Sequence, residues 1–224
     1  MHIPDGILPI TVCAAGYATA GAATWYSLRK INQQEDPQAG IPKAALLASA
    51  FFVASWIHIP VPPTSVHLIL NGLLGVVLGY YAFPAILIGL FFQAIMFQHG
   101  GLTTLGVNAT MMGVPALLAY GLFQLRGKLG RPNSQFLTGL FGFLGGTLGL
   151  GLAATIAFYI LITTIPANID VAAERASIVT LMMAHVPLAL IEGVFTAMLV
   201  VFLQKVKPEL LEAVSSQRQP HPVS

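Results

Sequence analysis

The sequence predicts an all-α membrane protein, built as a bundle of seven transmembrane helices. Hydrophobic residues make up 56% of the 224-residue chain and charged residues only 8%, whereas soluble domains carry about 25% charged residues. Long apolar segments alternate with short stretches that hold the charges, prolines and glycines. Because so few charges cannot solvate the surface of a soluble protein of this size, the chain is expected to cross a membrane several times.

A helix needs about 20 largely apolar residues to cross the hydrocarbon core of a bilayer. The apolar segments of this chain lie at 8–30, 42–58, 66–81, 83–98, 107–125, 136–163 and 177–204. The third and fourth are short, and Pro84 suits the first turn of the fourth because no N–H donor is needed there. We therefore expect one transmembrane domain, residues 1–207, followed by a polar cytoplasmic tail, residues 208–224.

The basic residues predict the orientation of the bundle. If seven spans alternate, nine of the ten Lys and Arg residues fall on one side and only Arg175 falls on the other. Cytoplasmic loops carry an excess of Lys and Arg. The N-terminus is therefore expected outside and the C-terminus inside.

Composition also excludes several functions. The net charge is +2 and no basic patch alternates with aromatic residues, so nucleic-acid binding is not expected. A single cysteine, Cys13, excludes an intramolecular disulfide and a cysteine metal cage. The segment 121–128 departs from a phosphate-binding loop in its spacing, and Leu129 stands where that motif has Ser or Thr. The chain is not expected to hydrolyse ATP, so an energy-driven process would need a partner or an ion gradient.

Histidines gather on the predicted outer side, in a chain that has few other ionisable groups. The residues concerned are His2, His58, His67, His99 and His185. A single membrane histidine is usually a packing residue, but several in one layer favour metal or proton chemistry.

The start of the chain can chelate a metal ion. The α-amine of Met1, the amide nitrogen of His2 and the His2 Nδ1 atom would bind one ion in fused five- and six-membered rings. Planar nitrogen donors suit Ni(II), Cu(II) or low-spin Co(II), whereas Zn(II) prefers a tetrahedron. One further imidazole would complete the plane, and the residues alone do not choose among the other histidines. Prolines and a glycine in 3–9 would form a rigid turn that returns His2 to the bundle.

Polar residues near the histidines each have two interpretations. Asp5 could cap the first helix, which is slightly favoured, or could accept a hydrogen bond that supports a metal ligand. If Ser65 caps the third helix, His67 lies in its first turn. Asn71 then lies one turn deeper, where it could orient the His67 ring or bond to a neighbouring helix.

Further polar residues lie at the outer ends of the fourth and fifth segments and inside the last. Gln93, Gln98, His99 and Asn108 could line an entrance, support the ligands, or bond within a loop that dips into the bundle. Glu192 lies two helical turns after His185. This carboxylate could exchange protons, anchor a ligand-bearing segment, or bridge helices in its protonated form.

Small residues at a spacing of four mark close helix contacts. Glycines at 139, 142, 145, 146 and 149 form a stripe of this kind on the sixth segment, and Ala44 and Ala48 form one on the second. Internal packing is the commoner use of such stripes, although one of them could dock a membrane partner.

Four motifs resemble those of the CbiM/NikM family, the substrate-specific membrane components of energy-coupling-factor transporters for cobalt and nickel. The motifs are Met1-His2-Ile3-Pro4-Asp5-Gly6, Ser65-Val66-His67-Leu68 with Asn71-Gly72, Gln98-His99-Gly100-Gly101-Leu102-Thr103-Thr104-Leu105-Gly106, and Ala184-His185-Val186-Pro187 with Glu192-Gly193. The resemblance covers residues 1–205.

The resemblance implies a six-helix core preceded by one additional N-terminal helix, in the plasma (inner) membrane of a prokaryote. It implies metal binding by Met1, His2 and His67. Two cytoplasmic ATPase subunits, a transmembrane coupling subunit and a separate small accessory membrane subunit would be the partners. By the same resemblance, Ala44 and Ala48 are candidates for docking the coupling subunit.

The function expected is therefore capture and import of Co(II), which would supply cobalamin biosynthesis, with the same role for Ni(II) as the alternative. The metal is the transported ligand, and no cofactor is expected. A remote alternative is an intramembrane metal-dependent enzyme that uses His99, His185 and Glu192. A third possibility is a component specific for an organic ligand, in which the histidines are only structural.

Overall fold

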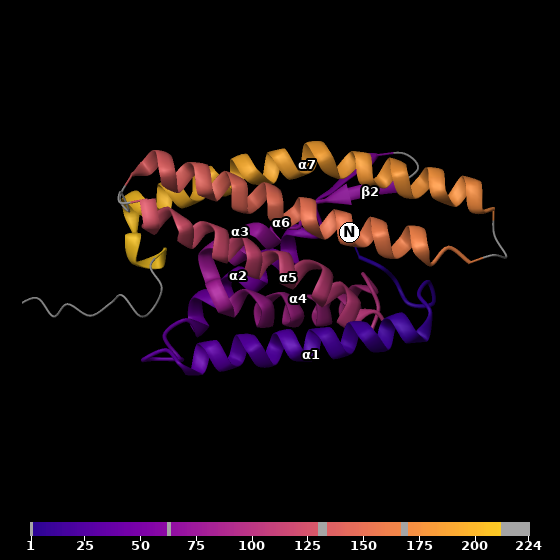
Figure 1. The fold of residues 1–224 in the computed structure, drawn as a ribbon, viewed down its shortest axis with the longest axis horizontal. Coiled ribbons are helices and arrows are strands. Elements are labelled where there is room, and N and C mark those ends of the chain that lie inside the picture. The colour runs from indigo at the N-terminus through magenta and orange to yellow at the C-terminus, as the bar shows by residue number, and fades with distance from the viewer. Residues whose placement is uncertain (1, 62–63, 130–133, 167–169, 212–224) are drawn as a thin grey trace, which may run out of the picture.

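The computed structural model describes residues 2–61, 64–129, 134–166 and 170–211 (Figure 1). Within these ranges the chain forms seven α-helices and one short β-hairpin. The helices are α1 (Ile10–Asn32), α2 (Ile41–Ala54), α3 (Asn71–Leu78), α4 (Ala82–Phe97), α5 (Leu105–Gln124), α6 (Gln135–Thr163) and α7 (Val171–Val206). The strands are β1 (His58–Val61) and β2 (Thr64–His67), which pair antiparallel with His58 opposite His67.

The long helices run roughly along one axis of the molecule. In Figure 1, α1 lies along one side, the antiparallel pair α6 and α7 lies on the opposite side, and α4 and α5 lie between them. Four helical segments are long and apolar enough to cross a membrane: Asn71–Phe97, Leu105–Lys128, Gln135–Thr163 and Val171–Val206. The helix α2 is apolar but shorter, with 14 residues. A helical, multi-pass membrane protein is confirmed, whereas seven spans and their orientation stay predictions.

Two predicted helices are shorter than expected. The segment 42–58 is helical only to Ala54, and the segment 66–81 begins as strand β2 and becomes helical at Asn71. The physical reason is local, because prolines 60, 62 and 63 push their preceding residues towards extended backbone. A prediction based on apolar composition alone does not take account of this preference for extended backbone before proline. As a result, His67 ends a strand and does not lie in the first turn of a helix.

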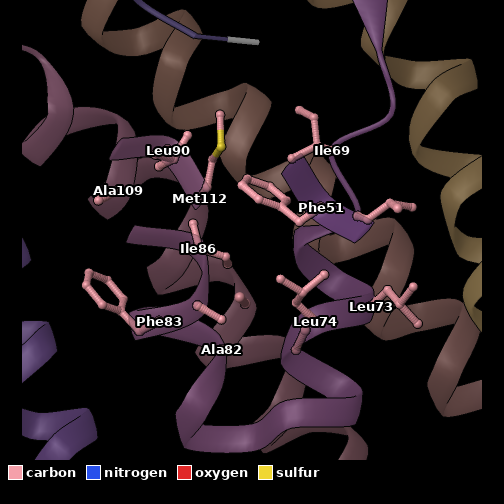
Figure 2. Packing of buried hydrophobic residues seen from close by; sticks show 14 of the residues in the cluster. Phe51, Ile69, Leu73, Leu74, Ala82, Phe83, Ile86, Leu90, Ala109 and Met112 are labelled. Atoms are coloured by element: carbon pink, nitrogen blue, oxygen red, sulfur yellow. The ribbon is translucent and has the colours of Figure 1, made fainter. Parts of the chain in front are cut away.

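A buried apolar core lies between α3, α4 and α5. Figure 2 shows α3 and α4 side by side, joined by a reversal at the short 3₁₀ turn Gly79–Tyr81. Gly79 has a φ of 59° there, a conformation that favours glycine. Side chains from both helices fill the space together with neighbours from α2 and α5; they include Phe51, Leu74, Phe83, Ile86 and Met112, all at most 1% exposed.

Basic side chains gather at the end of the bundle where α2 begins and where α3 and α5 end. Lys43 Nζ donates to the backbone oxygens of Val77 and Leu210, at 3.0 Å each. Arg126 donates to the Phe123 carbonyl at 3.1 Å. The two Lys43 bonds tie the short 3₁₀ turn Pro208–Leu210 against α2 and the end of α3. Basic residues from distant segments of the chain thus meet at this end, while the side of the membrane on which it lies stays a prediction.

The glycine stripe of α6 serves internal packing. A Cβ atom at Gly149 would lie 2.8 Å from the backbone nitrogen of Gly72 in α3, and one at Gly146 would lie 2.8 Å from the backbone oxygen of Glu192 in α7. These neighbours are backbone atoms and cannot rotate away. The glycines therefore allow α6 to approach α3 and α7 closely, as small residues do in other helical membrane proteins.

We predict that Gly149→Ala lowers the thermal unfolding midpoint of the detergent-purified protein, because overpacking a tight contact costs about 1–3 kcal/mol. The matched control is Gly151→Ala in the same helix, since a Cβ there meets nothing within 4 Å. The control should unfold at the wild-type temperature or slightly above it. Equal midpoints for the two variants would contradict the assignment of Gly149 to a backbone contact.

Candidate metal site

Three histidines from separate parts of the chain meet at one point. One nitrogen from each of His2, His67 and His99 lies within 4.8 Å of the other two. His2 Nδ1 is 3.2 Å from His67 Nε2, and His99 Nε2 is 3.4 Å from the same His67 atom. Their sequence separations of 65 and 32 residues show that tertiary structure alone brings them together.

The His67 ring is held in one tautomer by the backbone next to it. His67 Nδ1 lies 3.0 Å from the carbonyl oxygen of Leu68, an acceptor that requires a proton on Nδ1. The lone pair of His67 is therefore on Nε2, the atom that faces His2 and His99. A hydrogen bond of this kind is the usual way in which proteins orient a metal-binding imidazole.

The segment before α1 is fastened to α5 by its own backbone. The Ile3 amide donates to Asn108 Oδ1 at 2.9 Å, and the Ile3 carbonyl accepts from Asn108 Nδ2 at 3.0 Å and from Thr104 Oγ1 at 2.6 Å. Asn108, Thr104 and Ile3 are all at most 2% exposed. The backbone amide and carbonyl of Ile3 are thus both hydrogen-bonded to α5 and the residue before it. We call these bonds the Ile3 clamp, and they fix the backbone next to His2 against the bundle.

Asp5 fastens the same segment to the loop that leads into α5. Its carboxylate accepts from the amides of Leu102 and Thr103 at 3.1 and 2.9 Å, and from the Thr103 hydroxyl at 2.5 Å. The hydroxyl and amide bonds lower the pKa of Asp5 below its usual value. The prediction that Asp5 caps the first helix is wrong, because α1 begins after Pro9 without a side-chain cap.

His99 is presented by a sharp turn at the end of α4. Gln98 adopts the left-handed conformation with φ 53°, and the His99 amide donates to the Gln93 carbonyl at 3.1 Å. Gly100 follows with φ 88°, and a Cβ there would lie 3.6 Å from the Cβ of His2. The turn is therefore built against the N-terminal segment, while the Gln98 side chain is exposed.

Electrostatics keep the His2 ring neutral. Burial lowers its pKa well below 6.5, and the positively charged N-terminus and the neighbouring His67 and His99 rings act in the same direction. The Gln93 side chain opposes this shift as a hydrogen-bond acceptor. Among the described residues, neither His2 Nε2 nor Gln93 Oε1 has a hydrogen-bond partner that meets the usual distance and angle limits. A proton on Nε2 that faces Gln93 would leave the Nδ1 lone pair for a metal.

Glu192 anchors the backbone that follows His67. Its two carboxylate oxygens accept from the amides of Ile69 and Leu70, at 2.5 and 3.0 Å. Leu70 has φ 57°, so the chain turns sharply between β2 and α3 at this point. The carboxylate is 1% exposed. Of the predicted roles, the geometry favours an anchor for the ligand-bearing segment over proton exchange with a neighbour.

Two predicted residues lie outside the cluster. Asn71 Nδ2 donates to the carbonyls of Met112 and Gly149, at 3.1 and 2.9 Å, and its Oδ1 has no hydrogen-bond partner within the described part of the chain. Asn71 therefore links α3 to α5 and α6, and the prediction that it orients the His67 ring is wrong. His185 Nδ1 lies 2.7 Å from the Leu181 carbonyl of its own helix. Neither residue supplies a nitrogen or oxygen to the three-histidine group.

The distances in the cluster suit a transition metal. Two nitrogens that bind one ion at about 2.0–2.1 Å, at a right angle, lie about 2.9 Å apart. The His2–His67 separation exceeds this by only a few tenths of an ångström. Neutral imidazoles held in place by the surrounding protein are typical ligands for cobalt, nickel, copper and zinc. Sequence reasoning missed the roles of Thr103 and Thr104, although both lie inside a motif that it singled out.

Comparison with known proteins defines the class of this chain. A solved structure described as a truncated transition metal transporter superposes with a TM-score of 0.72 at 25% sequence identity, over 92% of this chain and 99% of the other. The chain is a membrane protein of the metal-transport class and not an enzyme. It belongs to the CbiM family, since the family described as the cobalt uptake substrate-specific transmembrane region matches residues 2–210.

Relatives carry names for both metals. A protein of Haemophilus influenzae whose name assigns it to metal transport is 35% identical, over 94% of this chain and 97% of its own. The fused nickel transport protein NikMN of Rhodobacter capsulatus is 32% identical, over 94% of this chain and 64% of its own. The cobalt transport protein CbiM of Sorangium cellulosum is 29% identical, over 97% of both. The chain is thus a cobalt/nickel transport membrane protein of this family.

We predict that Glu192→Gln weakens Co(II) or Ni(II) binding by about 10–100-fold, the usual cost of removing a group that positions a metal ligand. The amide would turn an N–H towards one of the two backbone N–H groups, so the segment after His67 would shift. Isothermal titration of the purified protein measures the change. Glu174→Gln, an exposed position in the first turn of the same helix, is the control and should bind as wild type. Unchanged affinity in Glu192→Gln would show that the hydrogen bonds of Glu192 do not position His67.

Proposed function

We propose that this chain is the substrate-binding membrane subunit of an energy-coupling-factor transporter that imports Co(II), with Ni(II) as the alternative substrate. The observation that carries the proposal is the placement of His2 Nδ1 beside His67 Nε2, at 3.2 Å. Relatives named for cobalt and for nickel support both metals. Cobalt imported in this way would supply cobalamin biosynthesis.

The proposed ligand set is planar and uses the first residues of the chain. The α-amine of Met1, the amide nitrogen and Nδ1 of His2, and Nε2 of His67 would provide four nitrogens. Met1 lies outside the described residues, so its part rests on the chemistry of the chelate. The clamp on Ile3 supports the proposal, because it fixes the backbone one residue after the chelating amide. The metal is the cargo, and the proposal needs no resident cofactor.

Partners would supply the energy. The proposal includes two cytoplasmic ATPase subunits, a transmembrane coupling subunit and a small accessory membrane subunit, in the plasma membrane of a prokaryote with the N-terminus outside. A groove of about 930 Å³ between α1, α2 and α4 supports a docking role for α2. Ala44 and Ala48 line it, together with large apolar side chains of α4 such as Ile88 and Phe92. Small residues on one wall would admit a helix of the coupling subunit.

We predict that Ala48→Leu prevents co-purification with the coupling and ATPase subunits without reducing metal content, because the larger side chain fills a groove that none of the histidines lines. Ala50→Leu is the matched control, since Ala50 is exposed on the same helix and does not line the groove. Co-expression of all subunits, followed by affinity purification and metal analysis, measures both quantities. A complete complex with the Ala48→Leu variant would exclude this face as the docking surface.

We predict that one alanine inserted between Met1 and His2 abolishes stoichiometric metal binding, because the amine and the imidazole would no longer close adjacent chelate rings on one amide. The measurement is metal content and affinity of protein purified with its native N-terminus by a C-terminal tag. The control carries one alanine after Ser224, which leaves the first residues intact. About one ion per chain in the control and none in the insertion variant is the expected result.

The same titration should release protons. The α-amine and the amide nitrogen must both lose a proton to bind, so affinity is expected to rise with pH. His2 should contribute little to this rise near neutral pH, because its lowered pKa already keeps the ring neutral. Equal metal binding by the insertion variant, or by protein with a blocked α-amine, would move the site away from the terminus.

A further inference from the structure

The residues that follow α7 leave the line of that helix and fold against the bundle (Figure 1). They are the 3₁₀ turn Pro208–Leu210 and Leu211, and we call residues 208–211 the C-terminal strap. Leu211 is only 6% exposed and lines a small cavity of about 30 Å³ between the end of α3 and α5. Segments outside helices normally run over the surface. The strap is instead packed into the bundle at its last residue.

Two basic side chains hold the strap by its backbone. Lys43 Nζ, from α2, donates to the Leu210 carbonyl at 3.0 Å, and Arg126, just after α5, donates to the Leu211 carbonyl at 3.4 Å. The Arg126 guanidinium also lies 3.7 Å from the centroid of the Phe123 ring, which fixes its position. Hydrogen bonds from charged donors are stronger than those between neutral groups. The strap is therefore fastened both to α2 and to the end of α5.

Lys43 joins three parts of the chain at one atom. Its second bond goes to the carbonyl of Val77, in the last turn of α3, at 3.0 Å. The last carbonyls of a helix have no partner within the helix and carry partial negative charge, so a cation is favourable there. In the described part of the chain, both hydrogen-bond partners of Lys43 Nζ are backbone oxygens. The ammonium group thus links α2, α3 and the strap.

The helix α2 is supported unevenly along its length. Near its last residues, Phe51 is 1% exposed, and a Cβ at Gly89 of α4 would lie 2.6 Å from its ring. Gln93 also donates to the Ser55 hydroxyl at 3.0 Å. Nearer the first residues of α2, one face of the helix lines the groove of about 930 Å³. Because an open groove supplies no packing atoms, this part of α2 depends more on the two bonds of Lys43.

We propose that the C-terminal strap, acting through Lys43, holds the first turns of α2 where they keep the groove between α1, α2 and α4 open for the coupling subunit. This inference rests on the proposed function, which assigns the groove to docking. Without the strap, α2 would lose a charged bond at its first turn and would settle into the groove, because closure buries apolar side chains such as Ile88 and Phe92. The end of α7 thereby controls a docking surface that it does not line.

Distances between two spin labels on the isolated chain test the position of α2. Labels at Leu46→Cys in α2 and Leu118→Cys in α5 report it, since both side chains are exposed and neither lines the groove; Cys13 is replaced by alanine. Lys43→Met removes the ammonium but keeps an apolar stem, and should shift and broaden the distance distribution. Lys43→Arg should keep the wild-type distribution, because a guanidinium can donate to two carbonyls. Lys205→Met, an exposed position in the last turn of α7, is the matched control.

Assembly with the partner subunits tests the effect on docking. The affinity of Lys43→Met for the coupling and ATPase subunits should fall about tenfold, the order expected when hydrogen bonds from a charged donor are lost. Its metal content should equal that of wild type, which shows that the variant is folded. Lys43→Arg and Lys205→Met should assemble as wild type does.

A second variant loosens the strap without removing a charge. Leu211→Ala should move the labels and weaken assembly as Lys43→Met does, whereas Val206→Ala, an exposed apolar position at the end of α7, should change neither. Because both residues act through one strap, the double variant should lose no more affinity than the weaker-binding single variant. Independent damage at two sites would instead give additive losses.

The outcomes separate this inference from the function on which it rests. Unchanged label distances in both Lys43→Met and Leu211→Ala would overturn it, as would normal assembly of a variant whose labels have moved, or additive losses in the double variant. The label distances require no partner and report on the strap alone. Failure of the wild-type chain to assemble with a coupling subunit would refute the proposed function, and this use of the strap with it, even where the labels show that the strap positions α2.

Discussion

Non-helical backbone near a bilayer must have its amides and carbonyls satisfied by protein, and this constraint organises the site. Each unsatisfied group would cost several kcal/mol in hydrocarbon. Three such segments meet here: the residues before α1, the turn from β2 into α3, and the loop between α4 and α5. Asn108 satisfies the first, Glu192 the second and Asp5 the third. The groups that make the irregular backbone stable are thus the same ones that place the histidines.

A few buried polar side chains satisfy the backbone groups of these segments, and each makes more than one hydrogen bond. Glu192 is buried, and its two carboxylate oxygens accept from the amides of Ile69 and Leu70, just after His67. Asn108 uses its oxygen and its nitrogen on a single residue, Ile3. Removal of either side chain would leave buried backbone groups without partners, which is costlier than loss of the bond itself. Site geometry and local stability are therefore coupled in this protein.

Much of the architecture could be predicted from the sequence. Apolar content predicted a helical membrane protein, and the segments 8–30, 107–125 and 136–163 lie close to α1, α5 and α6. The glycine stripe predicted close packing of the sixth segment, which contacts Gly72 and Glu192. The chelating chemistry of the first two residues also indicated His2 without any structural knowledge, because ring closure depends only on covalent spacing.

The remaining features depend on tertiary structure. Residues 66–70 are mostly apolar, so composition could not distinguish an extended segment there from the start of a helix, although the nearby prolines gave a local signal. The partners of Asp5 and Asn71 lie 97 and 41 to 78 residues away, and no spacing rule connects such positions. The choice of His99 over His185 as a neighbour of His2 likewise follows from how α4 ends, at the left-handed Gln98.

The core below the histidines has a consequence for how an ion could cross. The side chains of α2, α3, α4 and α5 fill the space beneath the cluster, and several of them are fully buried (Figure 2). A bundle closed in this way does not resemble a pore, in which ions pass in file while the protein stands still. It implies a carrier that would move each bound ion by changing its own arrangement. Uptake would then saturate with the number of copies in the membrane, and would produce no measurable conductance.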